Sequence, residues 1–275
     1  MKLQENENDI ILEYEKGNSA ITIGKQYGVD YSVIIRILKK NNISLRDQSL
    51  RRRKFLINDD FFAEINTEEK AYFLGLIYAD GYVNEKRNYL RLALKSNDVD
   101  ILIKFRDAIY DNKDKRLIVS RKKNCNDLLC VDVSSKKIVE DLKKLGVIQA
   151  KTFSITFPNK DQVSKHLISH FMRGYFDGDG CITFSEVCKK HKDKIYKQIN
   201  NKFEIIGTKE FCSVFFQCLD IKFSTTKIGA KNIIRATNSS FNSIKKIFSF
   251  LYNDSNIFLQ RKKEKFNNLI LIKNE

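Results

Sequence analysis

Two stretches of similar sequence decide the fold of this 275-residue chain: FLGLIYADG at residues 73–81 and MRGYFDGDG at residues 172–180. Each apolar run ends in Asp-Gly, which predicts a buried helix that stops at the aspartate. Small residues lie four positions apart on one face of each helix, namely Gly75 with Ala79 and Gly174 with Gly178. Because small side chains let helix axes approach more closely than the usual distance of about 8–10 Å, the two helices are predicted to pack against each other.

The elements after each motif come in the same order, which indicates two copies of one structural unit. A hairpin comes first, and its strand YLRLALK at 89–95 alternates leucines with other residues, as a half-buried strand does. The counterpart in the second copy is KFEIIG at 202–207. A helix then starts at Ser96 in one copy and at Thr208 in the other, and both residues are good N-caps. A closing helix ends each copy, after two more strands at about 116–121 and 128–133 or at about 223–228 and 232–237.

The paired helices would bring two aspartates together. Asp80 and Asp179 emerge from the last turns, where each helix carries roughly half a negative charge. Divalent metal ions relieve such repulsion, and carboxylate oxygens with carbonyls and water suit Mg²⁺. Two metals held in this way beside a basic surface can clamp the attacking and leaving oxygens of a phosphodiester. The residues therefore predict hydrolysis of a nucleic-acid backbone.

The two motifs resemble those of single-chain LAGLIDADG homing endonucleases, and RGYFDGDG at 173–180 is a highly specific string. The resemblance extends to the closing segments at 142–158 and 251–266. It implies an α+β fold of two pseudo-symmetric αββαββα units, with the motif helices at the interface and two saddle-shaped antiparallel sheets in the major groove of DNA.

The same resemblance implies the metal ligands. They are Asp80 and Asp179, which are also catalytic, joined by the backbone carbonyls of Ala79 and Gly178. Mg²⁺ is the expected cofactor, Mn²⁺ is expected to substitute for it, and Ca²⁺ to bind without supporting cleavage. Asp177 stands where the first motif has Tyr78, so it is not expected to be a ligand.

The family also places a basic residue near each metal, after the fourth strand of a repeat. Lys136 is the catalytic candidate in the first half, although a solvated helix start would explain it equally well. The second half has no lysine at the equivalent place. Either Lys227, Lys231 or Arg235 substitutes, or the two halves are unequal in catalysis. The stretch RKKEK at 261–265 either contacts phosphates or forms a solvent-exposed helix face.

Outward side chains of the predicted strands are the candidates for reading bases and phosphates. In the first repeat these are Tyr82, Asn84, Lys86, Tyr89, Arg91, Lys95, Arg116 and Arg121. In the second they are Thr183, Ser185, Lys197, Lys202, Lys227, Lys231 and Arg235.

Residues 10–46 predict a separate helical module, with Gly17 and Gly28 as breaks between three amphipathic stretches. Its last two helices resemble the helix-turn-helix of DNA resolvases. The outward residues Tyr31, Ser32, Arg36 and Lys39 would then contact DNA, unless the module is only a small packing domain. The polar segment that follows contains Arg51, Arg52 and Arg53, which either lie along phosphates or in a minor groove, or form a solvated charge run.

Composition agrees with a polyanionic partner. The chain has 50 Lys and Arg against 34 Asp and Glu, a formal net charge of +16. Residues 16–54 alone carry ten basic and two acidic residues. With 42% hydrophobic residues the chain can bury one or two cores, which excludes a disordered or fibrous protein. The six cysteines form no CxxC pair and are interpreted as reduced thiols, and the sequence contains no membrane span or signal peptide. A soluble, cytoplasmic protein of a bacterial, phage or organellar mobile element is expected.

These observations predict four segments: a helix-turn-helix domain at 1–45, a basic linker at 46–60, and LAGLIDADG repeats at 61–157 and 158–275, with Pro158 at the boundary. The predicted function is site-specific, Mg²⁺-dependent cleavage of both strands of DNA, across the minor groove of a long asymmetric target. The protein is expected to act as a monomeric pseudo-dimer without a membrane partner. Two alternatives stay open: an inactive DNA-binding regulator of the same fold, and a maturase that binds intron RNA.

Overall fold

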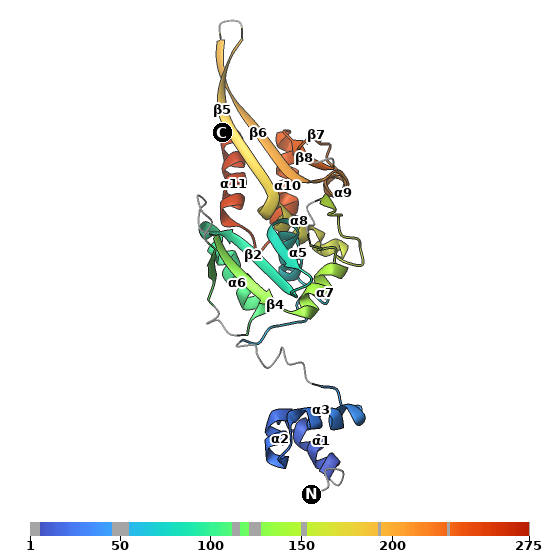
Figure 1. The fold of residues 1–275 in the computed structure, drawn as a ribbon. Coiled ribbons are helices and arrows are strands. Elements are labelled where there is room, and N and C mark those ends of the chain that lie inside the picture. Colours follow the sequence, from blue (N-terminus) through green and yellow to red (C-terminus); the bar gives the residue numbers. More distant parts are fainter. Residues whose placement is uncertain are drawn as a thin grey trace. The chain divides into compact units, whose positions relative to one another are not determined.

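The computed structural model describes residues 6–45, 55–111, 116–120, 128–149, 153–191, 194–229 and 232–274. The chain divides into two compact units, residues 1–54 and residues 55–275 (Figure 1). None of the described helices is both long enough and apolar enough to cross a membrane.

The N-terminal unit contains the three predicted helices, α1 (Glu7–Glu15), α2 (Ala20–Tyr27) and α3 (Tyr31–Lys40). Helix α2 ends at Gly28, which adopts the left-handed conformation (φ 67°), and the Asp30 side chain caps α3 by accepting a hydrogen bond from the Ser32 amide. A Cβ atom on Gly24 would lie 2.7 Å from the Val29 carbonyl oxygen, so glycine is needed where the chain turns back over α2. The unit has its own small core, made of Ile10, Tyr14, Ala20, Ile23, Ile34, Ile37 and Leu38.

The second unit contains the two predicted repeats. The elements of the first are α5 (Glu68–Asp80), β1 (Gly81–Asn84), β2 (Tyr89–Lys95), the 3₁₀ turn η2 (Ser96–Asp98), α6 (Val99–Ile109), β3 (Ile118–Ser120), β4 (Leu128–Ser134) and α7 (Lys136–Lys144). After the turn η4 (Lys165–Leu167), the second repeat has α8 (Ile168–Asp179), β5 (Gly180–His191), β6 (Lys194–Thr208), α9 (Lys209–Leu219), β7 (Ser224–Lys227), β8 (Ile233–Asn238), α10 (Phe241–Tyr252) and α11 (Gln260–Asn274). The predicted α+β fold of two similar units is confirmed.

Each repeat builds an antiparallel four-stranded sheet, with strand orders β1-β2-β4-β3 and β5-β6-β8-β7. Leu90, Leu92 and Leu94 of β2 are buried, so the predicted alternation is correct. Helices pack against this apolar face of the first sheet, and α9, α10 and α11 contact strands of the second (Figure 1). The opposite face of each sheet carries most of the polar strand residues.

Strand β6 is longer than predicted. It begins at Lys194 rather than near residue 202, and its pairing with β5 extends to His191. Within β6, only residues 203–208 pair with β8, so the outer part of the hairpin is a two-stranded ribbon (Figure 1). Its described side chains are mostly exposed, and apolar periodicity therefore could not reveal it.

The motif helices α5 and α8 cross at glycine. A Cβ atom on Gly75 would overlap the Phe171 carbonyl oxygen and lie 2.8 Å from the Tyr175 amide nitrogen. A Cβ atom on Gly174 would overlap the Tyr72 carbonyl oxygen and lie 2.9 Å from the Leu76 amide nitrogen. The predicted close packing of the two helices is confirmed, and one core extends across both repeats.

Candidate functional site

The C-terminal ends of α5 and α8 meet, as the glycine crossing requires. Asp80 and Asp179 are the last residues of these helices, and both are exposed. A Cβ atom on Gly178 would overlap the Ala79 Cβ and lie 3.0 Å from Asp80 Oδ2. The structure thus brings together three of the four predicted metal ligands, Asp80, Ala79 and Gly178. Asp179 directly follows Gly178.

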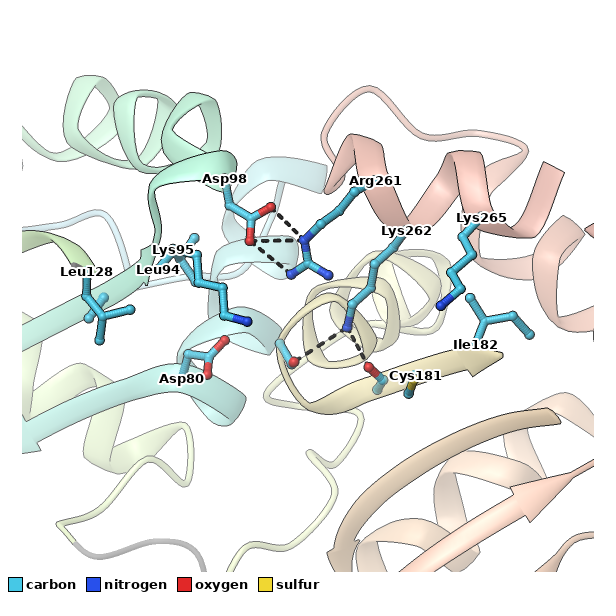
Figure 2. A pocket seen from close by; sticks show the side chains of 13 residues that line it. Asp80, Leu94, Lys95, Asp98, Leu128, Cys181, Ile182, Arg261, Lys262 and Lys265 are labelled. Atoms are coloured by element: carbon cyan, nitrogen blue, oxygen red, sulfur yellow. Dashed lines mark hydrogen bonds and ion pairs between the residues drawn. The ribbon is translucent and has the colours of Figure 1, made fainter. Parts of the chain in front are cut away.

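A cavity of about 560 Å³ opens beside Asp80. Its wall contains Lys95 and Leu128 from the first repeat, Gly178 and Cys181 from the second, and Lys265 from α11. In Figure 2 the Lys95 side chain extends toward Asp80, and the basic residues of α11 approach from the other side. The site is therefore composite, because Asp80 of the first repeat faces the basic residues of α11 in the second.

Lys262 of α11 is the buried cation of this site, with 7% of its surface exposed. Its Nζ donates a hydrogen bond to the carbonyl oxygen of Phe176 at 2.6 Å. It also donates to the carbonyl oxygen of Gly180 at 2.6 Å and lies 3.5 Å from that of Gly178 (Figure 2). Burial lowers the pKa of Lys262 to about 8, although Asp177 and Asp80 oppose this shift.

Of the two interpretations offered for residues 261–265, the solvent-exposed helix face is wrong for Lys262. Helical periodicity in the sequence is sufficient to place Lys262 on a buried face. Lys262 lies three residues after Leu259 and four before Phe266, both fully or almost fully buried, so helical periodicity places it on the apolar face of α11.

The neighbouring Arg261 holds α11 to the first repeat. Its guanidinium donates to both oxygens of Asp98, at 2.8 Å from Nε and 2.9 Å from Nη2 (Figure 2). Asp98 is 3% exposed and occupies the N-cap position of α6 without capping a backbone N–H. Because this ion pair joins residues 163 positions apart, local sequence patterns could not reveal it.

Asp177, which was not expected to be a ligand, is buried among hydrogen-bond donors. It is 1% exposed and accepts hydrogen bonds from the hydroxyls of Tyr72 and Tyr252, both at 2.9 Å, and from the Leu259 amide at 2.7 Å. Burial raises the pKa of Asp177, while Lys262 and these donors oppose that shift. The contacts fix the start of α11 against α8.

The structure does not bring Lys136 to this site. Lys136 is the first residue of α7, its side chain is 72% exposed, and its Nζ lies 3.6 Å from Glu140 Oε1. Strand β4 begins beside the cavity at Leu128 and runs away from it to Ser134. At about 3.3 Å per residue, Ser134 lies about 20 Å from Leu128 along the strand, and α7 starts after that. Lys136 is therefore not among the residues that line the cavity, and the end of the fourth strand points away from Asp80.

The substitutes considered for the second half lie on its sheet. Lys227 is exposed on β7, and Arg235 on β8 has its Nε 3.6 Å from Glu204 Oε1. Lys231 is outside the described residues.

The other candidate DNA-binding residues are mostly accessible. Tyr31, Ser32, Arg36 and Lys39 are exposed on α3, as predicted. On the sheets the exposed or partly exposed ones are Tyr82, Asn84, Lys86, Tyr89, Arg91, Lys95, Arg116, Thr183, Ser185, Lys197 and Lys202. Arg51, Arg52, Arg53 and Arg121 are outside the described residues.

The donors at the helix ends fit a hard divalent cation. Asp80 offers carboxylate oxygens, and its Oδ2 lies close to Gly178, whose backbone supplies a carbonyl. Mg²⁺ prefers oxygen ligands and is commonly bound by one or two carboxylates plus water and substrate phosphate. The part of the chain that the structure describes contains no cluster of three or more His, Cys, Asp or Glu suited to a metal.

Comparison with known proteins identifies structures with a similar fold. No protein-family model matches the chain. An uncharacterized protein of Methanocaldococcus jannaschii is 26% identical over 194 residues, which are 70% of this chain and 68% of that protein. The structure of the LAGLIDADG homing endonuclease I-LtrWI bound to target DNA has a TM-score of 0.52 at 15% identity, covering 79% of this chain and 91% of that one. Meganuclease I-SmaMI bound to uncleaveable DNA gives 0.51 at 14% identity, covering 74% and 90%. The chain has the fold of the LAGLIDADG homing endonucleases.

Proposed function

We propose that this protein is a sequence-specific endonuclease that cuts both strands of DNA and requires Mg²⁺. The observation that carries the proposal is the meeting of α5 and α8. Their glycine crossing juxtaposes two Asp-Gly helix ends, with Asp80 against Gly178, beside the buried amine of Lys262. This site lies where the first strands of both sheets begin, at Gly81 and Gly180.

The proposed metal ligands follow from this placement. Asp80 with the Gly178 carbonyl would hold one ion, and Asp179 with the Ala79 carbonyl would hold the other. A divalent metal bound there supplies electrostatic stabilisation of the attacking and leaving oxygens of a phosphodiester.

The chain's own cations would act on the phosphate. Lys262 is held against three backbone carbonyls and faces the cavity next to Asp80, so a positive charge is fixed close to the reacting group. Lys95 and Lys265 line the same cavity and would orient the phosphate. Preorganised charge in a partly dry site stabilises developing negative charge more strongly than mobile surface charge does.

DNA recognition is assigned to the polar faces of the two sheets and to α3. The structures of LAGLIDADG endonucleases bound to DNA, whose fold this chain shares, support this assignment. The exposed basic residues of α3 would add contacts through effective concentration, since both units are on one chain. We further propose a monomer acting as a pseudo-dimer, Mn²⁺ as a substitute cofactor, and a role in the mobility of an intron or similar element.

A cleavage selection tests the proposal. Purified protein is incubated with a randomised double-stranded DNA library and Mg²⁺, and cut molecules are sequenced. The expected result is one long target, cut in both strands with Mg²⁺ and left intact when EDTA replaces it. A defined target that is bound but never cut would instead favour a DNA-binding regulator. Activity in an intron RNA splicing assay without DNA cleavage would favour a maturase.

A further inference from the structure

Arg91 and Asp132 form a bidentate ion pair on the first sheet. Arg91 lies on β2 and Asp132 directly opposite on β4. Arg91 Nε donates to Asp132 Oδ1 and Nη2 donates to Oδ2, both at 2.7 Å. The side chains are 35% and 17% exposed, so the pair is accessible but largely shielded from water.

The pair lies on the face of the sheet that is turned away from the core. Side chains alternate along a strand, and the neighbours Leu90 and Leu92 on β2 belong to the core. On β4 the same holds for Val131 and Val133, which flank Asp132. Arg91 and Asp132 therefore point to the face to which DNA recognition is assigned above.

The surroundings fix the guanidinium in one orientation. Its carbon lies 5.7 Å from the centre of the Tyr89 ring, and the Tyr89 side chain is hydrogen-bonded with both Arg91 and Asp132. Tyr110 donates a hydrogen bond from its hydroxyl to the Asp132 backbone carbonyl at 2.5 Å, which anchors β4 at this position. The hydrogen bond with Asp132 raises the pKa of Arg91, so the guanidinium is charged at any working pH.

The remaining donors of Arg91 have a defined geometry. A guanidinium carries five N–H groups in one plane, and Asp132 uses Nε and one hydrogen of Nη2. Asp132 does not use the end of the plane, which carries one hydrogen on Nη1 and another on Nη2. Two parallel donors in this spacing match O6 and N7 of guanine in the major groove. They also match a phosphate, but the Asp132 carboxylate makes the pair neutral overall and repels phosphate.

We infer that Arg91, held by Asp132, reads one guanine of the DNA target. Arg91 would be a specificity-determining residue and Asp132 the positioning residue that presents it. This inference rests on the proposed function, because it needs the sheet to face the major groove.

The test uses binding, so that it does not depend on cleavage. The Asp80→Asn, Asp179→Asn double variant serves as the parent and is used to select binding sites from a randomised DNA library. Arg91→Ala, Arg91→Lys and Asp132→Ala are then made in this parent. Lys143→Ala is the matched control, because Lys143 pairs with Glu85 at 2.7 Å and belongs to helix α7 rather than to the sheet face.

The parent should prefer guanine at one position of its site. Arg91→Ala should reduce that preference by roughly 5- to 100-fold and leave the other positions unchanged. Arg91→Lys keeps the charge but has no planar pair of donors, so it should lose most of the same preference and guards against a folding defect in Arg91→Ala. Asp132→Ala should weaken discrimination at that position by a smaller factor, about threefold or more, and strengthen binding to unselected DNA. Lys143→Ala should change neither.

The inference is overturned if a defined site is bound and no variant of Arg91 changes the preference at a single base pair. It is equally overturned if Asp132→Ala changes the affinity for all sequences by the same factor. If the parent selects no DNA site at all, the proposed function falls together with this inference.

Discussion

The crossing of α5 and α8 predicts an unusual response to Gly→Ala substitution. Alanine in the middle of a helix normally stabilises a protein by about 1 kcal/mol relative to glycine. Here a Cβ atom on Gly75 or on Gly174 would meet the backbone of the other helix, which cannot rotate away as a side chain can. Each substitution must push the helices apart.

The expected magnitude follows from these opposing effects. Overpacking a core costs about 1–3 kcal/mol, and rigid backbone contacts place this site at about 3 kcal/mol. Subtracting the gain in helix propensity leaves a net loss of about 2 kcal/mol for Gly75→Ala and for Gly174→Ala. In a domain of this size this lowers Tm by about 4–8 °C. One separation of the helices relieves both overlaps, so the overpacking cost of about 3 kcal/mol arises once while both alanines gain helix propensity. The double variant should therefore lose about 1 kcal/mol rather than the about 4 kcal/mol expected from additive losses.

Urea unfolding followed by near-UV circular dichroism measures these free energies in the single and double variants. A single variant more stable than the original protein would show that the helices do not approach as closely as described. Additive losses in the double variant, within about 0.5 kcal/mol, would show that the two glycines do not share one crossing.

Three further predictions concern other parts of the molecule. Asp177→Ala removes the acceptor of two buried tyrosine hydroxyls and one backbone N–H. It should lower the free energy of unfolding, measured in urea, by about 3 kcal/mol. A loss below about 1 kcal/mol would show that these hydrogen bonds do not hold the two helices as described. Lys262→Met should lower the single-turnover cleavage rate about 100-fold or more, while the affinity for DNA changes less than about threefold. If the cleavage rate and the affinity fall by the same factor, Lys262 does not act on the reacting phosphate. Arg36→Ala should weaken DNA binding and reduce the slope of log K against log[salt] by about 1. The amine of Lys40 pairs with Glu7 at 3.0 Å, so Lys40→Ala should have a smaller effect. Equal effects of the two substitutions would argue against contact of DNA with the Arg36 face of α3.

The sequence was sufficient for the parts of the fold that local patterns encode. The Asp-Gly helices, the alternation of β2 and the order of elements in both repeats all follow from periodicity and end signals. Gly75 and Gly174 also predicted the contact between the two helices, because small residues on a buried helix face let a second helix approach closely.

The site was only partly predictable, because it depends on which ends of the elements meet. Lys136 was expected near Asp80, but strand β4 leads away from the helix ends before α7 begins. Lys262 reaches the site through α11, the last helix of the second repeat, and its partners are backbone carbonyls that sequence patterns do not mark. The ion pairs of Arg261 with Asp98 and of Arg91 with Asp132 depend on tertiary packing and strand register.

The most direct test of the central claim is strand-resolved cleavage of the selected target by Asp80→Asn and Asp179→Asn, each made alone. Both substitutions keep the size of the side chain and remove a charge proposed to hold Mg²⁺. The account predicts that each variant binds the target within about threefold of the original affinity and cuts at least one strand at least about 100-fold more slowly. Cleavage of both strands at the original rate by both variants would contradict it.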